Sequence, residues 1–304
     1  MGCVSTIPQG PAWSGEPQRT LLRGLLDDAS LFPPGSLPMP TAVAAHVRNE
    51  SAWFSELTGP FVCPDTKIAE LTRALTAANV GWIDLSLVIT GGAAAVGAAT
   101  DAVAADARLR LRAVEVPAAK GPPPAQAVTE VAAALDSVPL AGATGYIEFP
   151  LAAIADPATA GPLLDLADQR GYRPKLRTGG VTPEAFPAEE TLAGCLAAVA
   201  DRRIPFKCTA GLHHAVRCTD QAAGLEQHGF LNVLLAVRAA AVDASVGDIA
   251  AILAERDQAK VTAAVRALDQ EAAEQVRWLF TSFGTCSTDE PVADLVSLGL
   301  LSQH

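Results

Sequence analysis

Two of the five lysines in the sequence, Lys175 and Lys207, lie in segments that could carry chemistry. Lys175 belongs to Arg173–Gly180 (RPKLRTGG) and Lys207 to Ile204–His214 (IPFKCTAGLHH), and each segment has the pattern of a short strand running into a loop. Side chains alternate between the faces of a strand, so Lys175 and Arg177 share one face. A lysine beside other cations loses proton affinity, and a neutral amine can attack a carbonyl carbon to form a Schiff base. The sequence therefore predicts Lys207 as a nucleophile whose pKa is lowered by Lys175 and Arg177.

Carboxylates near these lysines could transfer protons or pair with them. Asp28 and Glu148 end predicted strands, and we expect one of them to shuttle the proton while Lys207 holds the iminium. Asp27 is expected to face the opposite side from Asp28. The structural alternative is that Lys207 forms a buried ion pair with Glu148 or Asp28, since such pairs mimic perturbed catalytic groups. His213 could act as a general acid or base over the site.

The segment after Lys175 also has the residue types of an anion site. A guanidinium, a hydroxyl and a Gly-Gly turn with exposed N–H groups suit a carboxylate or a phosphate. Gly-Gly is also ordinary turn chemistry, so a simple strand-to-helix turn is the alternative. The predicted substrate-binding residues are Arg177, Thr178, Gly179, Gly180, Thr209 and His214.

A metal site is the other chemical alternative. His213 and His214 are adjacent and would point apart in an extended chain. No H-x-H or H-E-x-x-H spacing occurs, so the leading hypothesis includes no metal or other cofactor. In the alternative, Asp28, Glu148 and His213 bind a divalent ion.

The elements that must position these residues alternate along the chain. Eight segments with strand patterns are each followed by a helical pattern, at spacings of roughly 30 residues that are typical of βα units. The predicted strands are Gly24–Pro34, Gly59–Pro64, Gly81–Ile89, Arg110–Pro117, Gly145–Leu151, Arg173–Gly180, Ile204–His214 and Leu279–Ser287. Eight such units predict a single-domain α/β protein, a (β/α)8 TIM-type barrel over 19–304. A doubly wound open sheet is the competing fold.

Two segments have other expectations. Residues 1–18 are expected to be a flexible leader, because Gly10, Pro11, Gly15 and Pro17 break regular structure. Its first residues match an N-myristoylation pattern, although the Ala-rich, Arg-over-Lys composition suggests a bacterium, which lacks that machinery. The long segment Ala215–Leu279, with a helical region over 229–279, is either a lid over the barrel mouth or ordinary helical packing.

Composition limits the class of partner. The 304 residues carry a net charge of −11 and no basic stripe, which argues against nucleic acid. No apolar run reaches the length of a membrane-spanning helix, so no membrane partner is expected. The six cysteines form no C-x-x-C pair, which is typical of reduced thiols in a cytoplasmic protein.

The order K-x-R-T-G-G and then F-K-C-T-A-G resembles the deoxyribose-phosphate aldolase type of class I aldolase barrel. In that family a strand with one lysine precedes the strand whose K-T-x-T-G-like phrase carries the Schiff-base lysine. The phrase that starts at Lys207 is similar and departs from it at Cys208 and Ala210. The resemblance covers Arg173–His214, and the family's later phosphate-binding strand has no clear counterpart. The phrases LFPP, KLRTGG and TAGLHH also resemble a bacterial family that implies no function.

The leading hypothesis is therefore a class I, Schiff-base lyase of small-molecule metabolism. It would act on a small anionic carbonyl compound, with Lys207 as nucleophile, and could form a homo-oligomer. The alternatives are a metal-assisted hydrolase or isomerase on the same barrel face, and a barrel that binds a small anion without catalysis.

Overall fold

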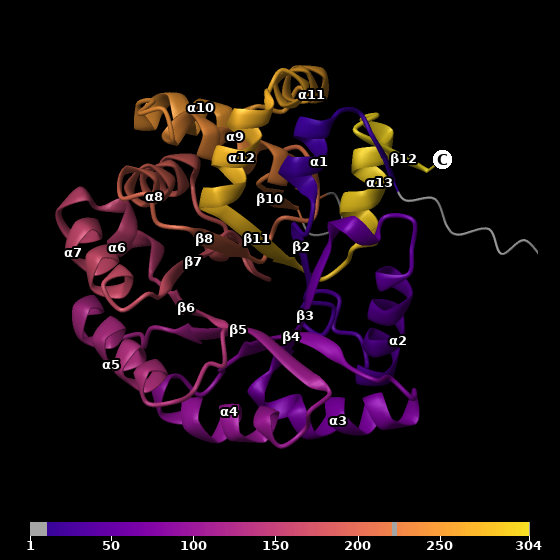
Figure 1. The fold of residues 1–304 in the computed structure, drawn as a ribbon. Coiled ribbons are helices and arrows are strands. Elements are labelled where there is room, and N and C mark those ends of the chain that lie inside the picture. Colours follow the sequence, from indigo (N-terminus) through magenta and orange to yellow (C-terminus); the bar gives the residue numbers. More distant parts are fainter. Residues whose placement is uncertain (1–10, 221–223, 304) are drawn as a thin grey trace, which may run out of the picture.

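The computed structural model describes residues 11–220 and 224–303, which form a closed barrel of parallel strands inside a ring of helices (Figure 1). The strand order around the barrel is β11-β2-β3-β4-β5-β6-β7-β8. The strands are β2 (Leu26–Asp28), β3 (Thr58–Pro64), β4 (Ile83–Val88), β5 (Leu109–Pro117), β6 (Thr144–Glu148), β7 (Arg173–Arg177), β8 (Phe206–Thr209) and β11 (Phe280–Thr285). Each predicted strand overlaps one of these eight, so the predicted (β/α)8 barrel is confirmed and the open sheet is wrong.

The helices cover the outside of the barrel. They are α1 (Glu16–Leu22), α2 (Met39–Glu50), α3 (Ile68–Ala77), α4 (Val96–Ala104), α5 (Pro124–Asp136), α6 (Leu151–Ala155), α7 (Pro157–Asp168), α8 (Glu189–Asp201), α9 (Phe230–Ala240), α10 (Val246–Ala254), α11 (Gln258–Arg266), α12 (Gln270–Leu279) and α13 (Asp289–Ser297). Short 3-10 turns are η1 (Ser55–Leu57), η2 (Asp65–Lys67), η3 (Ala93–Ala95) and η4 (Pro183–Ala185). The helical region 229–279 forms α9 to α12, and α9 packs against α8, α10 and α12, so it belongs to the ring.

The N-terminal segment is tied to the C-terminal one. Strand β1 (Pro11–Trp13) pairs antiparallel with β12 (Leu301–Gln303), and α1 follows directly. The indigo and yellow ends of the described chain therefore lie side by side (Figure 1). The predicted flexible leader is wrong for 11–18, because β1 pairs with β12 and α1 begins at Glu16; residues 1–10, with the myristoylation pattern, lie outside the described residues. A second small sheet pairs β9 (Cys218–Asp220) with β10 (Leu225–Gln227).

The alternation of residue types along the strands explains which side chains face the helices and which face the barrel interior. In β7 and β8, the apolar Leu176 and Cys208 are fully buried and alternate with the charged Lys175 and Lys207. Since successive side chains point to opposite faces, the apolar pair packs toward the helices and the lysines point into the barrel. Among the described residues, no helix is both long enough and apolar enough to cross a membrane.

Candidate active site

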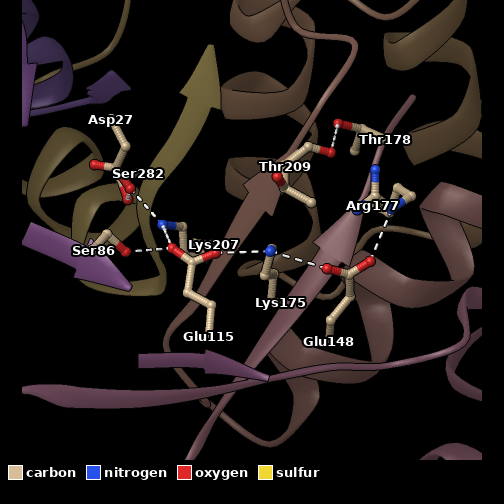
Figure 2. A network of polar contacts seen from close by, with 10 residues as sticks. All are labelled: Asp27, Ser86, Glu115, Glu148, Lys175, Arg177, Thr178, Lys207, Thr209 and Ser282. Atoms are coloured by element: carbon tan, nitrogen blue, oxygen red, sulfur yellow. Dashed lines mark hydrogen bonds and ion pairs between the residues drawn. The ribbon is translucent and has the colours of Figure 1, made fainter. Parts of the chain in front are cut away.

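Lys207 is the centre of a buried polar network inside the barrel (Figure 2). Its Nζ lies 2.5 Å from Asp27 Oδ2 and 2.6 Å from Glu115 Oε1. Ser282 Oγ donates to Asp27 Oδ2 at 2.8 Å, and Ser86 Oγ donates to Glu115 Oε1 at 2.5 Å. The Lys207 side chain is only 2% exposed. The ammonium therefore has two carboxylate partners, each of which is also held by a serine hydroxyl.

Lys175 continues the network toward the mouth of the barrel. Its Nζ lies 2.7 Å from Glu115 Oε2 and 3.0 Å from Glu148 Oε2. Arg177 Nε donates to the other oxygen of Glu148 at 2.8 Å. The result is an alternating chain of three carboxylates and three cations, in the order Asp27, Lys207, Glu115, Lys175, Glu148 and Arg177 (Figure 2).

The charges set the protonation states of this network. Burial alone would lower the pKa of Lys207, but the carboxylates of Asp27 and Glu115 outweigh it and hold that pKa well above its usual range. Burial alone would raise the pKa of Glu115, but Lys175 and Lys207 hold it well below its usual range. The prediction that Lys175 and Arg177 lower the pKa of Lys207 is wrong, because carboxylates separate the cations.

Strand register brings these side chains together. Lys175 on β7 pairs with Lys207 on β8 in the parallel ladder, and Glu148 on β6 pairs with Lys175. Glu115 on β5 lies opposite Tyr146 on β6, whose ring centroid is 5.4 Å from Lys207 Nζ. Because Glu148, Lys175 and Lys207 are aligned across three neighbouring strands, their side chains form one layer of the barrel interior.

A cavity of about 250 Å³ opens onto this network. Its lining includes Lys175, Lys207 and Glu115, together with apolar side chains such as Phe32 and Val88. Carboxyl ends of the strands contribute these residues, and this end of a TIM barrel is where active sites lie. Glu148 does not line the cavity, and neither does Asp27. The cavity therefore combines buried amines with an apolar wall.

Only part of the predicted anion-binding segment lies at the cavity. Arg177 and Gly180 line the cavity, and Arg177 keeps nearly half of its side chain exposed. Thr178 is fully buried, and its hydroxyl donates to Ala210 O at 2.5 Å. Thr178 thus fastens the loop after β7 to the loop after β8 and has no exposure to a substrate. The prediction that it binds substrate does not fit this geometry.

A close backbone approach fixes the same two loops. A Cβ on Gly179 would lie 2.5 Å from Gly211 Cα, a distance that real Cβ atoms do not show. Gly211 has φ +76°, a left-handed conformation that glycine adopts without strain. Gly179 is therefore required by packing and contributes no binding group, whereas Thr209 lines the cavity as a substrate-binding residue would.

Asp28 lies apart from the lysines, contrary to its predicted role. His46 Nδ1 lies 3.0 Å from Asp28 Oδ2, and the Ser30 amide donates to Asp28 Oδ1 at 3.1 Å. Asp27 takes the place expected for Asp28, because strand alternation points one to the interior and the other to the helices. The assignment of the two faces was reversed, so Asp28 is not placed to shuttle a proton or to pair with Lys207.

The two histidines fall on different sides of the loop after β8. His213 lines the cavity, and its Nδ1 lies 3.2 Å from Glu290 Oε2 and 3.5 Å from Cys286 Sγ. His214 Nδ1 lies 3.2 Å from Asp294 Oδ2, and His214 does not line the cavity. Only His213 is placed to meet a ligand there, so the substrate-binding role predicted for His214 does not fit this geometry.

Glu115 and Asp27 are members of the buried network that the predicted site did not include. Glu115 is one charged residue within the apolar run A-V-E-V of a strand, and it is only 2% exposed. A lone carboxylate in such a run requires a buried cation as partner, and this signal could have selected it. Nothing in the sequence distinguished Asp27 from its neighbour.

The residues of the metal alternative do not come together. Asp28 pairs with His46, Glu148 with Lys175 and Arg177, and His213 with Glu290. Over 11–220 and 224–303, no group of three or more His, Cys, Asp or Glu side chains is arranged to hold a metal ion.

Comparisons with known proteins extend the fold assignment only. No family model matches the sequence, and no curated protein sequence matches it. Among solved structures, the fold is similar to the tetrameric deoxyribose phosphate aldolase from Aeropyrum pernix, with a TM-score of 0.51 and 14% sequence identity over 93% of each chain. These comparisons lend no support to the resemblance with a bacterial family. The structural likeness supports the TIM-barrel fold.

Proposed function

We propose that this protein is a Schiff-base lyase of the aldolase type that acts on a small carbonyl compound. One observation carries the proposal: two buried lysines, Lys175 and Lys207, share the Glu115 carboxylate on the wall of a cavity at the carboxyl ends of the barrel strands. A Schiff-base mechanism needs one amine to be neutral and benefits from a second, charged donor at the carbonyl oxygen.

Charge balance favours Lys175 as the nucleophile in place of Lys207. A proton lost from Lys207 would leave Asp27 without a hydrogen-bonded cation, because Ser282 is its other hydrogen-bond partner and Arg277 acts on it only at longer range. A proton lost from Lys175 would leave Glu115 still paired with Lys207. Glu148 would likewise remain paired with Arg177. An uncompensated buried carboxylate is costly, so the neutral amine is more easily formed at Lys175.

The reaction then follows from these positions. The neutral Lys175 amine attacks the carbonyl carbon, and the Lys207 ammonium, on the same cavity wall, donates to the oxygen that becomes negative. The proton that Lys175 gave up returns from solvent to the carbinolamine oxygen, and loss of water then gives the iminium, which restores the positive charge between Glu115 and Glu148. The network is thus electrically unchanged between the ammonium and iminium forms, and it needs no cofactor.

Arg177 is the proposed contact for an anionic group of the substrate. Its Nε is used by Glu148, and its two terminal nitrogens make no hydrogen bond within the described residues. These nitrogens can bind a carboxylate in the two-point manner of guanidinium groups. The cavity of about 250 Å³ limits the substrate to a small compound.

A barrel that binds a small anion without catalysis is the second candidate. The observation that favours it is the balance of the network, in which every buried cation and carboxylate has a partner. Such networks also occur for purely structural reasons. A homo-oligomer is also proposed, because the similar aldolase is described as tetrameric; light scattering of the purified protein would test it.

Trapping of the imine distinguishes these candidates. The protein is incubated with acetaldehyde, acetone or pyruvate, reduced with borohydride, and mapped by peptide mass. The proposal predicts one reduced adduct, on Lys175, in the unmodified protein. Lys175→Gln should abolish the adduct, whereas Lys260→Gln, at an exposed lysine, is the matched control and should not. Saturable binding of the same compounds without any adduct would refute the lyase and favour the binding protein.

A further inference from the structure

An aldol reaction through a Schiff base needs a base that removes a proton from the carbon next to the imine. Among the described residues, no carboxylate near the cavity is available for this step. Glu115 accepts from Lys175, Lys207 and Ser86, and its pKa is held well below the usual range by the two lysines. Burial raises the pKa of Glu148, but Lys175 and Arg177 more than offset this and lower it overall. A base must accept a proton at working pH, and these two carboxylates resist doing so.

His213 is the group at the cavity with the right chemistry. It is 13% exposed and lies on the loop that follows Lys207 on β8. A carboxylate can only accept, so the 3.2 Å contact with Glu290 requires a hydrogen on Nδ1. That tautomer leaves a lone pair on Nε2. The ring is therefore oriented by a carboxylate, and its basic Nε2 has the Cys286 thiol as its neighbour, with Sγ 4.0 Å away.

Cys286 does not compete for this role. Its Sγ is 3.5 Å from Nδ1 and 4.0 Å from Nε2 of His213. Burial raises the pKa of the Cys286 thiol, so it stays protonated at neutral pH and is a poor base. The charged and titratable groups that contact His213 or line the cavity with it are Glu290 from α13, Cys286 from the loop after β11, the carboxylate Glu115, and the cations Lys175, Arg177 and Lys207.

We propose that His213 Nε2 exchanges the proton on the carbon next to the imine, and that Glu290 is its positioning residue. This inference rests on the proposed Schiff-base function. In the forward step, Nε2 takes the proton from the α-carbon of the Lys175 iminium. The C–H electron pair becomes the C=C bond of the enamine, and the C=N electron pair returns to the lysine nitrogen. When the enamine carbon bonds to an acceptor aldehyde, the new alkoxide takes the proton back from His213.

Deuterium exchange measures this step without a complete aldol reaction. The full chain is incubated with acetone in D2O, and α-deuteration above the buffer rate is followed by NMR. We expect His213→Gln to lower the exchange rate by at least about 100-fold, the usual contribution of general acid–base catalysis, and to keep the borohydride-trapped adduct. His214→Gln is the matched control, because His214 pairs with Asp294 outside the cavity, and it should exchange at the normal rate.

The pH profile provides a readout that a structural role would not change. The exchange rate should fall toward acid pH as imidazole becomes protonated, and this limb should disappear in His213→Gln. Glu290→Gln should lower the exchange rate and keep the adduct, since the ring loses the carboxylate that orients it. An adduct with unchanged exchange in His213→Gln would overturn this inference alone. If the unmodified protein forms no adduct, the proposed function itself fails.

Discussion

Asp27→Asn should destabilise the protein more than any comparable change at a surface ion pair. Asp27 Oδ2 lies 2.5 Å from Lys207 Nζ, and both side chains are nearly inaccessible to water. The amide keeps the shape of the carboxylate and removes its charge. Lys207 is then left with Glu115, which it already shares with Lys175.

The magnitude follows from the geometry. Two unit charges at this separation attract by about 7 kcal/mol at an effective dielectric constant of 20. Part of that loss is offset, because a neutral amide costs less to bury than a carboxylate. Removal of one member of a buried pair typically costs about 3–5 kcal/mol. Since Lys207 retains one carboxylate, we expect a loss of about 3 kcal/mol in the free energy of unfolding.

Urea unfolding, followed by both tryptophan fluorescence and circular dichroism, measures this loss. Asp165→Asn is the control, because Asp165 forms a half-exposed pair with Arg202 and should show no measurable change. Lys207→Met in the Asp27→Asn background should restore part of the stability, because it removes the under-compensated cation. If Asp27→Asn proves as stable as the control Asp165→Asn, the view that Asp27 and Lys207 are a charged pair is refuted.

Three further predictions concern charge, backbone and thiols. The pKa of Glu115 is depressed in the folded state, so its contribution is lost as pH falls below its unfolded value of about 4.3. Between pH 4 and 3, the unfolding free energy of Glu115→Gln should therefore vary less with pH than that of the unmodified protein, by up to about 1.4 kcal/mol per unit in urea titrations. Gly211→Ala should lower the free energy of unfolding by about 2–4 kcal/mol, more than Gly24→Ala does. Both glycines have positive φ, but of the two only Gly211 lacks space for a Cβ, and thermal unfolding compares the variants. A disulfide reagent should modify Cys286, which lines the cavity, much faster than Cys195, because burial raises the pKa of the Cys195 thiol to about 12. A ligand in the cavity should slow the reaction of Cys286 only.

The barrel was predictable because its signals are local. Each strand is a short apolar run bounded by breakers, and each helix shows its own periodicity, so counting them required no knowledge of contacts. Alternation along two neighbouring strands also indicated that Lys175 and Lys207 point the same way, and the ladder pairs them. Strand β2 shows the limit of such prediction, because Asp27 and Asp28 are adjacent and of the same type. A shift of one residue in phase exchanges inside for outside, and the sequence contains nothing that fixes it.

The electrostatics of the site could not be predicted from one segment at a time. Three cations on neighbouring strands suggested mutual repulsion, whereas Glu115 from β5, on the far side of β6, lies between the two lysines. The sign of the pKa shift of Lys207 depends on that contact and on Asp27. Both contacts join residues far apart in the sequence, so they follow only from closure of the barrel.

The identity of the reduced lysine tests the central claim most directly. The unmodified protein is treated with a small carbonyl compound and borohydride, digested, and the modified peptide is sequenced by mass spectrometry. We predict the adduct on Lys175, with Lys207 unmodified, because Asp27 and Glu115 keep Lys207 as an ammonium. An adduct on Lys207, or none on either lysine, would contradict the account.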